Sequence, residues 1–396
     1  MTTALGIAAL SCAIWVYLLA ARGGFWQAAT RDDMAVTALA KSIVWPRVVA
    51  VIPARDEAEV IGGTVESLLR QDYRGGFSVV IVDDHSGDDT ADIARRSAAL
   101  SGASDRLTVL AAPMLPPGWT GKLWATQHGI RHVEARPGGS TYLLLTDADI
   151  RFANDTLTEL VSRAVRQRLV LTSLLAKLRC VSLPERAFIP AFVFFFQMLY
   201  PFPWVNRADR RTAAAAGGCM LVDREALETA GGLDAIRSEL IDDCALARLL
   251  KPHGPIWLGL SRRIESARAY RSLGEIRRMI IRCAYAQLRF SRWWLAVSTL
   301  AMVVTYLAPP VLALFGSGMT QLLGALGWTF MALALQPTLR FYGLSFWWGL
   351  ALPVIGAAYL VFTLDSAFQH LRGRGGEWKG RVHNGTSANE IARHGD

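Results

Sequence analysis

From Val48 onward, short apolar runs alternate with longer segments of helical pattern. The apolar runs lie at 48–52, 79–82, 107–110 and 142–145, and the helical patterns at 57–70, 88–100, 123–136 and 157–168. Such alternation predicts an α/β fold with a mainly parallel sheet. Because the apolar runs are continuous, helices are expected on both faces of the sheet. Further strands are expected at 169–175, 218–222 and 256–260.

The N-terminal segment is apolar enough to lie in lipid. Residues 4–21 form a run that can span a bilayer, with Arg22 directly after it and no Lys or Arg before it. This charge pattern predicts an uncleaved anchor with its N-terminus outside, and a cleavable signal peptide is the alternative. Overall, 52% of the residues are hydrophobic and 19% are charged, whereas about a quarter are charged in ordinary soluble proteins.

The C-terminal part contains further membrane signals. Apolar segments lie at about 295–315, 321–335 and 344–362, and a basic tail follows them. Three spans would put this tail outside, against the positive-inside rule, so the short segment 321–335 is a candidate re-entrant segment. The stretch 188–205 is interrupted by prolines and is predicted to line the interface or the core instead of spanning. Residues 271–292 have the pattern of an amphipathic helix on the membrane surface.

These signals divide the chain into five regions. They are an N-terminal transmembrane anchor (1–22), an α/β domain (46–265), an amphipathic interfacial helix (266–293), a C-terminal transmembrane region (294–364) and a basic polar tail (365–396). The net charge of +9 is concentrated beside the apolar C-terminal region. We therefore expect a lipid bilayer as the partner, and no nucleic acid.

Acidic residues follow the ends of the predicted strands. The segment Pro53–Glu57 follows the first strand, Asp83 and Asp84 follow the second, and Asp147 and Asp149 follow the strand at 142–145. Because ligands of open α/β sheets bind outside the carboxyl ends of the strands, these residues are expected at one site. Asp83 and Asp84 can bind a uracil N–H and ribose hydroxyls, or can cap the following turn.

The pair Asp147 and Asp149 forms a DxD arrangement. Both carboxylates point to the same side of an extended segment and suit Mg²⁺ or Mn²⁺ bridging a diphosphate, although they can also be solvated loop residues. The five cysteines form no CxxC pair and the seven histidines no HExxH pair, so carboxylates are the expected metal ligands. Lys122 can place a second cation at a leaving diphosphate, or can be solvated.

Asp242 and Asp243 begin a helix expected at 243–250. A carboxylate at this place can accept the proton of an attacking hydroxyl, or can be an ordinary helix cap. No GxGxxG follows the first strand, which disfavours a nucleotide-dependent dehydrogenase.

The four acidic motifs together resemble the ordered signature of family 2 glycosyltransferases, which are inverting enzymes with the GT-A fold. The resemblance covers about residues 47–265. It implies a catalytic base at Asp243 beside Asp242, and metal binding by Asp149 with Asp147 assisting. The implied nucleotide-sugar-binding residues, with Lys122 added for the leaving diphosphate, are Pro53, Glu57, Asp83, Asp84, Lys122 and Asp147.

Longer stretches are similar to the hopene-associated branch of that family, at 115–125, 189–201 and 213–222. This similarity implies an acceptor lipid related to hopanoids. A (Q/R)xxRW element of related enzymes has its best match in Arg289, Arg292 and Trp293, which can instead be interfacial anchors. The chain departs from the family at Asp56, where Asn is frequent, and at His85, where Gly is usual.

The resulting hypothesis is a metal-dependent, inverting transfer of a sugar from a nucleotide-diphospho-sugar, expected to be a UDP-sugar, to a membrane-lipid hydroxyl. The expected location is the inner membrane, with several spans and the α/β domain facing the cytoplasm where such donors occur. A processive polysaccharide synthase is an alternative, which product length would distinguish. A non-catalytic scaffold that binds the nucleotide-sugar is another, and it would not depend on Asp243. The sequence indicates neither the sugar nor the oligomeric state.

Overall fold

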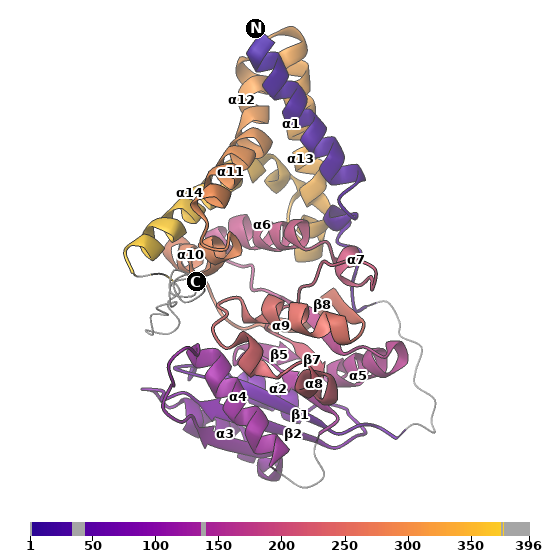
Figure 1. The fold of residues 1–396 in the computed structure, drawn as a ribbon, viewed down its shortest axis with the longest axis vertical. Helices are drawn as coiled ribbons and strands as arrows, with labels where there is room; N and C mark the ends of the chain where they lie inside the picture. Colours follow the sequence, from indigo (N-terminus) through magenta and orange to yellow (C-terminus); the bar gives the residue numbers. More distant parts are fainter. Residues whose placement is uncertain (1, 34–43, 136–139, 374, 376–396) are drawn as a thin grey trace, which may run out of the picture. The chain divides into compact units, whose positions relative to one another are not determined.

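The computed structural model describes residues 2–33, 44–135, 140–373 and 375 (Figure 1). These residues divide into two compact units. The sheet unit contains residues 30–178 and 205–268, and the helical unit contains residues 1–29, 179–204 and 269–376, apart from the residues outside the described ranges.

The sheet unit is built on an eight-stranded sheet, with the order β3-β2-β1-β4-β7-β6-β8-β5 among the described residues. The strands are β1 (Val48–Ala54), β2 (Phe77–Asp83), β3 (Leu107–Ala111), β4 (Tyr142–Leu145), β5 (Ile150–Phe152), β6 (Leu171–Lys177), β7 (Met220–Asp223) and β8 (Ile256–Ser266). Four neighbouring pairs are parallel, whereas β4–β7, β6–β7 and β5–β8 are antiparallel. The sheet is therefore mixed, where a mainly parallel one was expected.

Helices cover both faces of the sheet around β1, as the continuous apolar runs predicted. The helices of this unit are α2 (Ile61–Leu69), α3 (Thr90–Leu100), α4 (Gly121–Glu134), α5 (Thr156–Gln167), α8 (Arg224–Thr229) and α9 (Asp242–Leu250). Every residue of β1 is buried. Ala50 and Ile52 share a core cluster with α2 and α3, while α4 packs on the other face. Gly129 allows this packing, because a Cβ there would lie 2.5 Å from Val51 Cγ1.

The strand order has a reversal point beside β1. The chain runs from β1 through β2 to β3 on one side, and then returns to β4 on the other side of β1. A crevice beyond the carboxyl ends of the strands at such a reversal is where ligands bind in open α/β sheets. Arg55–Glu57 follows β1 and Thr146–Asp149 follows β4, so both acidic motifs flank this crevice.

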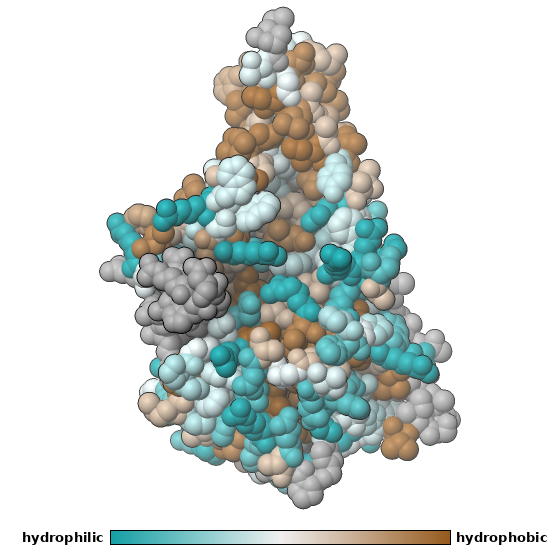
Figure 2. Space-filling view, in the orientation of Figure 1, coloured by the Kyte–Doolittle hydropathy of each residue, from teal (hydrophilic) through white to brown (hydrophobic). Residues whose placement is uncertain are grey.

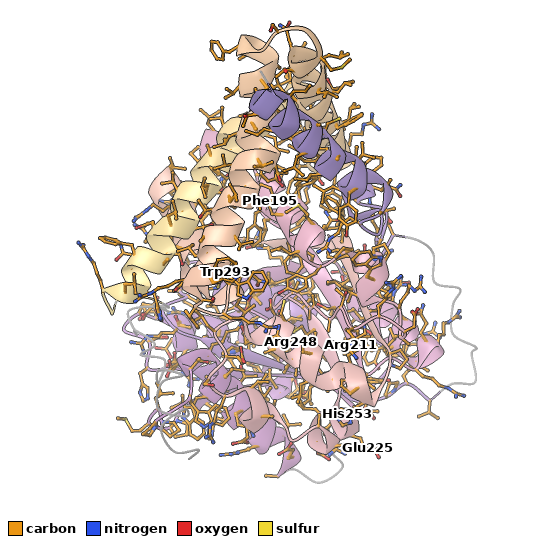
Figure 3. The ribbon with its side chains drawn as sticks, turned by 45° about the horizontal axis from the view of Figure 1, so that its top comes forward. Phe195, Arg211, Glu225, Arg248, His253 and Trp293 are labelled. Carbon is orange, nitrogen blue, oxygen red and sulfur yellow. The ribbon has the colours of Figure 1, made fainter. Side chains whose placement is uncertain are left out.

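The helical unit contains α1 (Thr2–Ala20), α6 (Leu183–Leu199), α10 (Leu273–Gln287), α11 (Arg292–Met302), α12 (Ala308–Phe315), α13 (Gly318–Tyr342) and α14 (Leu352–Leu371), while the short α7 (Phe202–Val205) lies at the boundary of the two units. Its core includes Trp15, Tyr306 and Met331. Phe195 of α6 packs edge-on against Tyr359, with ring centroids 4.7 Å apart (Figure 3). Figure 2 shows apolar residues gathered on the surface of α1, α12 and α13.

Five helical segments among the described residues are long and apolar enough to cross a membrane. They are 3–20, 183–205, 292–315, 318–342 and 346–371. Segment 183–205 was expected to be too short, but helix α6 continues through Pro190. Connectivity nevertheless prevents it from crossing, because β6 before it and β7 after it pair within one sheet.

Three further expectations about this unit need correction. The segment 321–335 is part of the 25-residue α13, so it is not too short to span. The amphipathic helix ends at Gln287, since Arg289 and Phe290 have φ angles of 54° and 55° that break it. Helix α14 continues past residue 365 to Leu371, and the tail beyond residue 375 lies outside the described residues.

Candidate active site

The loops that follow β1 and β2 are hydrogen-bonded to each other. The N–H of Glu57 donates to Thr90 Oγ1 at 2.8 Å, and the N–H of Gly87 donates to Asp56 Oδ1 at 2.7 Å. Asp56 and His85 have φ angles of 51° and 55°. Left-handed backbone favours Gly, Asn and Asp. This preference explains why Asn is frequent at position 56 and Gly is usual at position 85.

Asp83 and Asp84 face different surroundings. Asp83 Oδ1 accepts a hydrogen bond from the hydroxyl of Ser86 and lies at the end of β2. Asp84 is fully buried, and its Oδ2 lies 3.9 Å from Arg55 Nη1. Of the two carboxylates, Asp83 is therefore the more exposed, while Asp84 lies inside the protein.

The two carboxylates of the DxD arrangement also have different partners. Asp147 Oδ1 lies 2.9 Å from Lys122 Nζ, and its side chain is 37% exposed. Asp149 is buried, and its Oδ2 accepts hydrogen bonds from Ser266 Oγ at 2.9 Å and from Arg268 Nε at 3.1 Å. The two carboxylates thus have different protein partners.

Arg268 was not expected from the sequence. It directly follows β8, and its Nη2 also donates to both carboxylate oxygens of Glu57, at 2.7 and 2.9 Å. One guanidinium therefore joins the loop after β1 to the loop after β4. The sequence offered no signal for it, because the strand was expected to end at residue 260 and continues to Ser266, and because its partner Glu57 lies 211 residues away in the chain.

Lys122 connects the pair Asp242 and Asp243 to the DxD loop, because its ammonium contacts both Asp242 and Asp147. It stands in the first turn of α4, where Thr120 caps the helix by accepting from the N–H of Leu123. Its Nζ lies 3.0 Å from Asp242 Oδ2 and 2.9 Å from Asp147 Oδ1. Burial would lower the pKa of Lys122, but the charges of the nearby aspartates outweigh it and hold the pKa above its ordinary value.

Asp243 is held by backbone donors. Its Oδ2 accepts from the N–H of Gly217 at 3.0 Å, and its Oδ1 accepts from the N–H of Cys244 at 2.7 Å. Burial and the charge of Asp242 raise the pKa of Asp243 to about 6, against the opposing effect of Lys122 and the two N–H groups. A carboxylate with this pKa is ionised at neutral pH and is still basic enough to take a proton.

Gly217 lies among these side chains and was not predicted as a site residue. A Cβ built on it would lie 3.2 Å from Lys122 Nζ, 3.6 Å from Asp243 Oδ2 and 3.7 Å from Asp147 Oδ2. It is in the stretch 213–222 that carried the sequence resemblance, although nothing in that stretch marked this glycine among its neighbours.

A small cavity of about 20 Å³ opens at this cluster. Its lining includes the charged side chains of Lys122, Asp147 and Asp242, together with Gly217. Its apolar lining includes Met220 of β7 and residues of α4 and α9. The predicted residues Pro53, Lys122, Asp147 and Asp242 are therefore brought together at one place.

The proposed acceptor-side residues belong to the helical unit. Arg289 lies in the turn between α10 and α11, Arg292 begins α11, and Trp293 is 71% exposed (Figure 3). The candidate site itself consists of residues of the sheet unit.

A divalent cation fits the residues of the DxD loop. Among the described residues, no group of three or more His, Cys, Asp or Glu side chains is arranged to hold a metal. Mg²⁺ usually keeps several waters and takes only one or two carboxylates together with substrate phosphates. Asp147 and Asp149 supply such a carboxylate set, with Asp147 the more exposed of the two.

Comparison with known proteins gives one family match. The model of the family described as "Glycosyltransferase like family 2" matches residues 46–282. No curated protein sequence matches the chain.

Three solved structures are similar to this chain to different extents. The mannosyltransferase PcManGT from Pyrobaculum calidifontis, solved with GDP-Man and Mn²⁺, has a TM-score of 0.54 at 21% identity, over 91% of this chain and 99% of that chain. Mannosyl-3-phosphoglycerate synthase from Rubrobacter xylanophilus has a TM-score of 0.40 at 19% identity, over 72% and 84%. S. aureus TarS has a TM-score of 0.39 at 15% identity, over 68% and 42%. The first of these likenesses establishes the fold.

Proposed function

Because the chain belongs to glycosyltransferase family 2 and has the GT-A fold, we propose that it transfers a sugar, with inversion, from a nucleotide-diphospho-sugar to a hydroxyl group of a membrane lipid. The observation that carries this proposal is the position of Asp243, which lies beside Asp242, Lys122 and Asp147 with a pKa of about 6. The sequence resemblance supports a UDP-sugar as donor and a lipid related to hopanoids as acceptor.

The proton of the acceptor is assigned to Asp243. As the acceptor oxygen bonds to the anomeric carbon, its O–H bond breaks and the proton passes to the Asp243 carboxylate. The bond from the anomeric carbon to the diphosphate oxygen breaks on the opposite face, and the nucleoside diphosphate leaves. The N–H groups of Gly217 and Cys244 fix the carboxylate so that it does not have to reorganise during this step.

The donor is assigned to the loops after β1, β2 and β4. Pro53, Glu57 and Asp83 are proposed to bind the nucleoside, and Asp84 lies inside the loop near Arg55. Lys122 stands where it can neutralise the leaving diphosphate, since its ammonium already bridges Asp147 and Asp242. A divalent cation held by Asp147 and Asp149 would stabilise the negative charge of the departing diphosphate.

The acceptor is assigned to the membrane. The helical segments 3–20, 292–315 and 318–342 support a membrane-embedded enzyme. The position of Arg22 directly after the first apolar segment supports a sheet unit on the cytoplasmic side, where nucleotide-sugars occur. Arg289, Arg292 and the exposed Trp293 are proposed to lie at the headgroup level, where an acceptor hydroxyl would be presented.

Labelling of lipids tests donor and acceptor together. Membranes containing the full chain are incubated with a panel of radiolabelled nucleotide-sugars, with and without EDTA, and their lipids are extracted. We expect one donor to label a lipid with a single sugar, and EDTA to abolish the labelling. A long polymeric product would favour a processive synthase. Donor binding without any labelled product would contradict the proposal and favour a scaffold.

A further inference from the structure

Strand pairing attaches the backbone of Asp149 to the end of β8. The short strand β5 begins directly after this residue, and Ile150 pairs with Ser266 in antiparallel register. The next hydrogen bond runs from the N–H of Ala267 to the carbonyl oxygen of Asp149, at 2.8 Å. The residues that end and follow β8 therefore lie beside the DxD loop.

The two oxygens of the Asp149 carboxylate have different surroundings. Oδ2 accepts from Ser266 Oγ at 2.9 Å and from Arg268 Nε at 3.1 Å. Oδ1 accepts no hydrogen bond from the residues that the structure describes, and it is not one of the buried side-chain oxygens left without a partner. The residue is only 7% exposed, so its side chain has little room to reorient. Oδ1 is therefore the oxygen that a cation can approach.

A second buried carboxylate holds Arg268 in place. The Nη2 of Arg268 donates to both oxygens of Glu57, at 2.7 and 2.9 Å, and Glu57 is 8% exposed. Because the guanidinium is planar, its Nε and Nη2 donors point in fixed directions, which a lysine ammonium cannot reproduce. The backbone N–H of Arg268 also donates to Ser266 Oγ, at 3.3 Å. Ser266 and Arg268 thus form one connected support for Asp149.

Asp147 is held differently. Its Oδ1 lies 2.9 Å from Lys122 Nζ, which also lies 3.0 Å from Asp242 Oδ2, and its side chain is 37% exposed. A cation that binds this oxygen has to compete with the ammonium, whereas the donors at Asp149 occupy only the oxygen Oδ2. Of the two carboxylates, Asp149 is the one that the protein already holds with an oxygen left for a cation.

We infer that Arg268, together with Ser266, is a positioning residue of the proposed metal site, which fixes Oδ2 of Asp149 and so presents Oδ1 to the divalent cation. The inference rests on the proposed function and deepens it, because it names a support outside the DxD loop. Partners of this kind orient metal ligands, and their loss typically costs about 10–100-fold in metal affinity. A carboxylate that is already held in one orientation loses less conformational freedom on binding.

Mn²⁺ binding tests this role without any need for turnover. Electron paramagnetic resonance would report free Mn²⁺ during titration of the purified full chain, with UDP or GDP as the probe nucleotide. Arg268→Gln is expected to weaken Mn²⁺ binding by about 10–100-fold. Ser266→Ala removes one of the two donors to Oδ2 and should weaken binding by less. Arg268→Lys keeps the charge without the planar set of donors, so it should also bind more weakly than the wild type.

Two comparisons show whether Arg268 acts through Asp149. Asp149→Asn should lose about tenfold or more in Mn²⁺ affinity, and Arg268→Gln added to it should change nothing further. An effect of the positive charge alone would persist in this background, and its removal would tighten Mn²⁺ binding. Arg263→Gln is the matched control, because Arg263 lies on the same strand but pairs with Asp155, beyond the other end of β5. It should bind Mn²⁺ as the wild type does.

Melting temperatures show which variants are folded. Arg268→Gln leaves two buried carboxylates without their cation and is expected to melt at a lower temperature. Ser266→Ala retains that cation, so it decides the question if Arg268→Gln does not fold.

Three results would overturn the inference. One is Mn²⁺ binding as tight as in the wild type, or tighter, in folded Arg268→Gln or Ser266→Ala. Another is an effect of Arg268→Gln that stays equally large in the Asp149→Asn background. The third is a wild type that binds no Mn²⁺ with either nucleotide, which contradicts the proposed metal dependence as well. Failure of lipid labelling while Mn²⁺ binding depends on Arg268 would contradict the proposed transfer alone and support the inference.

Discussion

Lys122 lies among carboxylates from two distant parts of the chain, with Asp147 after β4 on one side and Asp242 of α9 on the other. Asp243 follows in the first turn of the same helix and is bonded to the N–H of Gly217. The ammonium therefore stabilises an acidic cluster that would repel itself without a cation. It also influences the protonation of the proposed base.

The rate of transfer is expected to rise with pH through a midpoint of about 6, because Asp243 accepts a proton only when ionised. Between pH 5 and pH 7 the ionised fraction, and hence the rate, should increase roughly tenfold. Lys122→Met removes a charge that lowers the pKa of Asp243, so the acid limb should move to higher pH. Initial rates at saturating donor, measured from pH 5 to 8, would check this. A flat profile would contradict it.

Asp243 is also expected to make the fold less stable at neutral pH. Its pKa of about 6 lies above the ordinary 3.8, so its contribution to stability is fully present below about pH 4 and is lost as the pH rises through 6. Asp243→Asn should therefore stabilise the protein at pH 8 by on the order of 2 kcal/mol, and by nearly nothing at pH 4. Melting temperatures of both proteins at the two pH values test this sign. Equal differences at both would refute it.

Gly217→Ala is expected to reduce transfer while the protein stays folded. Its Cβ would lie 3.2 Å from Lys122 Nζ, which must move away from Asp147 and Asp242. The shift required of Lys122 is a few tenths of an ångström. Because a misplacement of about 1 Å can cost on the order of a hundredfold in rate, this smaller shift should cost less than that. Gly274→Ala is the matched control, since its Cβ would meet only Ser272 Oγ, at 3.7 Å. Equal activity of the two variants would show that the glycine has no role.

At the scale of elements, the sequence predicted those parts that depend on local pattern. The apolar runs of β1, β2 and β4 were found because each is buried on both faces. The strand β5 was missed because it has only three residues, directly after the DxD loop. The direction of β7 was also missed, since pairing between strands distant in the chain decides it.

The candidate site was predictable where it depends on local sequence pattern, and was not predictable where it depends on contacts between distant segments. Acidic residues at strand ends are visible in the sequence because the strands themselves are. Arg268 and Gly217 were not predictable in this way, because each acts on residues that approach it only after folding. The two aspartates of the DxD loop looked equivalent for the same reason, although Arg268 binds one and Lys122 the other.

Helix α14 ends beside the amphipathic helix α10. Arg277 Nη2 lies 2.5 Å from Asp365 Oδ2, and the ring of Phe290 stacks on His370 with centroids 4.4 Å apart. At its other end α14 follows Gly349, which packs against the middle of α13 at Ala332. The segment 346–371 therefore begins beside the middle of α13 and ends beside α10.

We accordingly expect three crossings, by α1, by 292–315 and by 318–342, with the tail in the cytoplasm as the positive-inside rule requires. Single cysteines labelled from outside with an impermeant maleimide would test this arrangement. Cysteine replacing Ser317, in the exposed turn before α13, should react. Cysteine replacing Gly375 or Asp105 should react only after the membrane is opened. External labelling at residue 375 would restore the third C-terminal crossing, and labelling at 105 would refute the cytoplasmic sheet unit.

At the scale of the whole molecule, the chain combines a sheet unit with a helical unit whose helices are apolar enough to lie in a membrane. The sheet unit contains the proposed donor site and the proposed base, and the helical unit contains apolar surface and exposed aromatic residues such as Trp293. This arrangement is that of an enzyme only if the acidic cluster performs chemistry. A scaffold that binds nucleotide-sugars would have the same fold and the same membrane helices.

Asp243→Asn separates these two cases most directly. Asn retains the size of the side chain and caps a helix about as well as Asp, so the fold and the donor site should persist. Transfer of sugar to lipid should fall by roughly 10²–10⁴-fold, the usual scale of general-base catalysis, whereas Asp242→Asn should reduce it less. Lipid labelling and donor affinity are measured in parallel on both variants. Near-normal transfer by Asp243→Asn would contradict the account, and loss of donor binding would place this residue in the donor site instead.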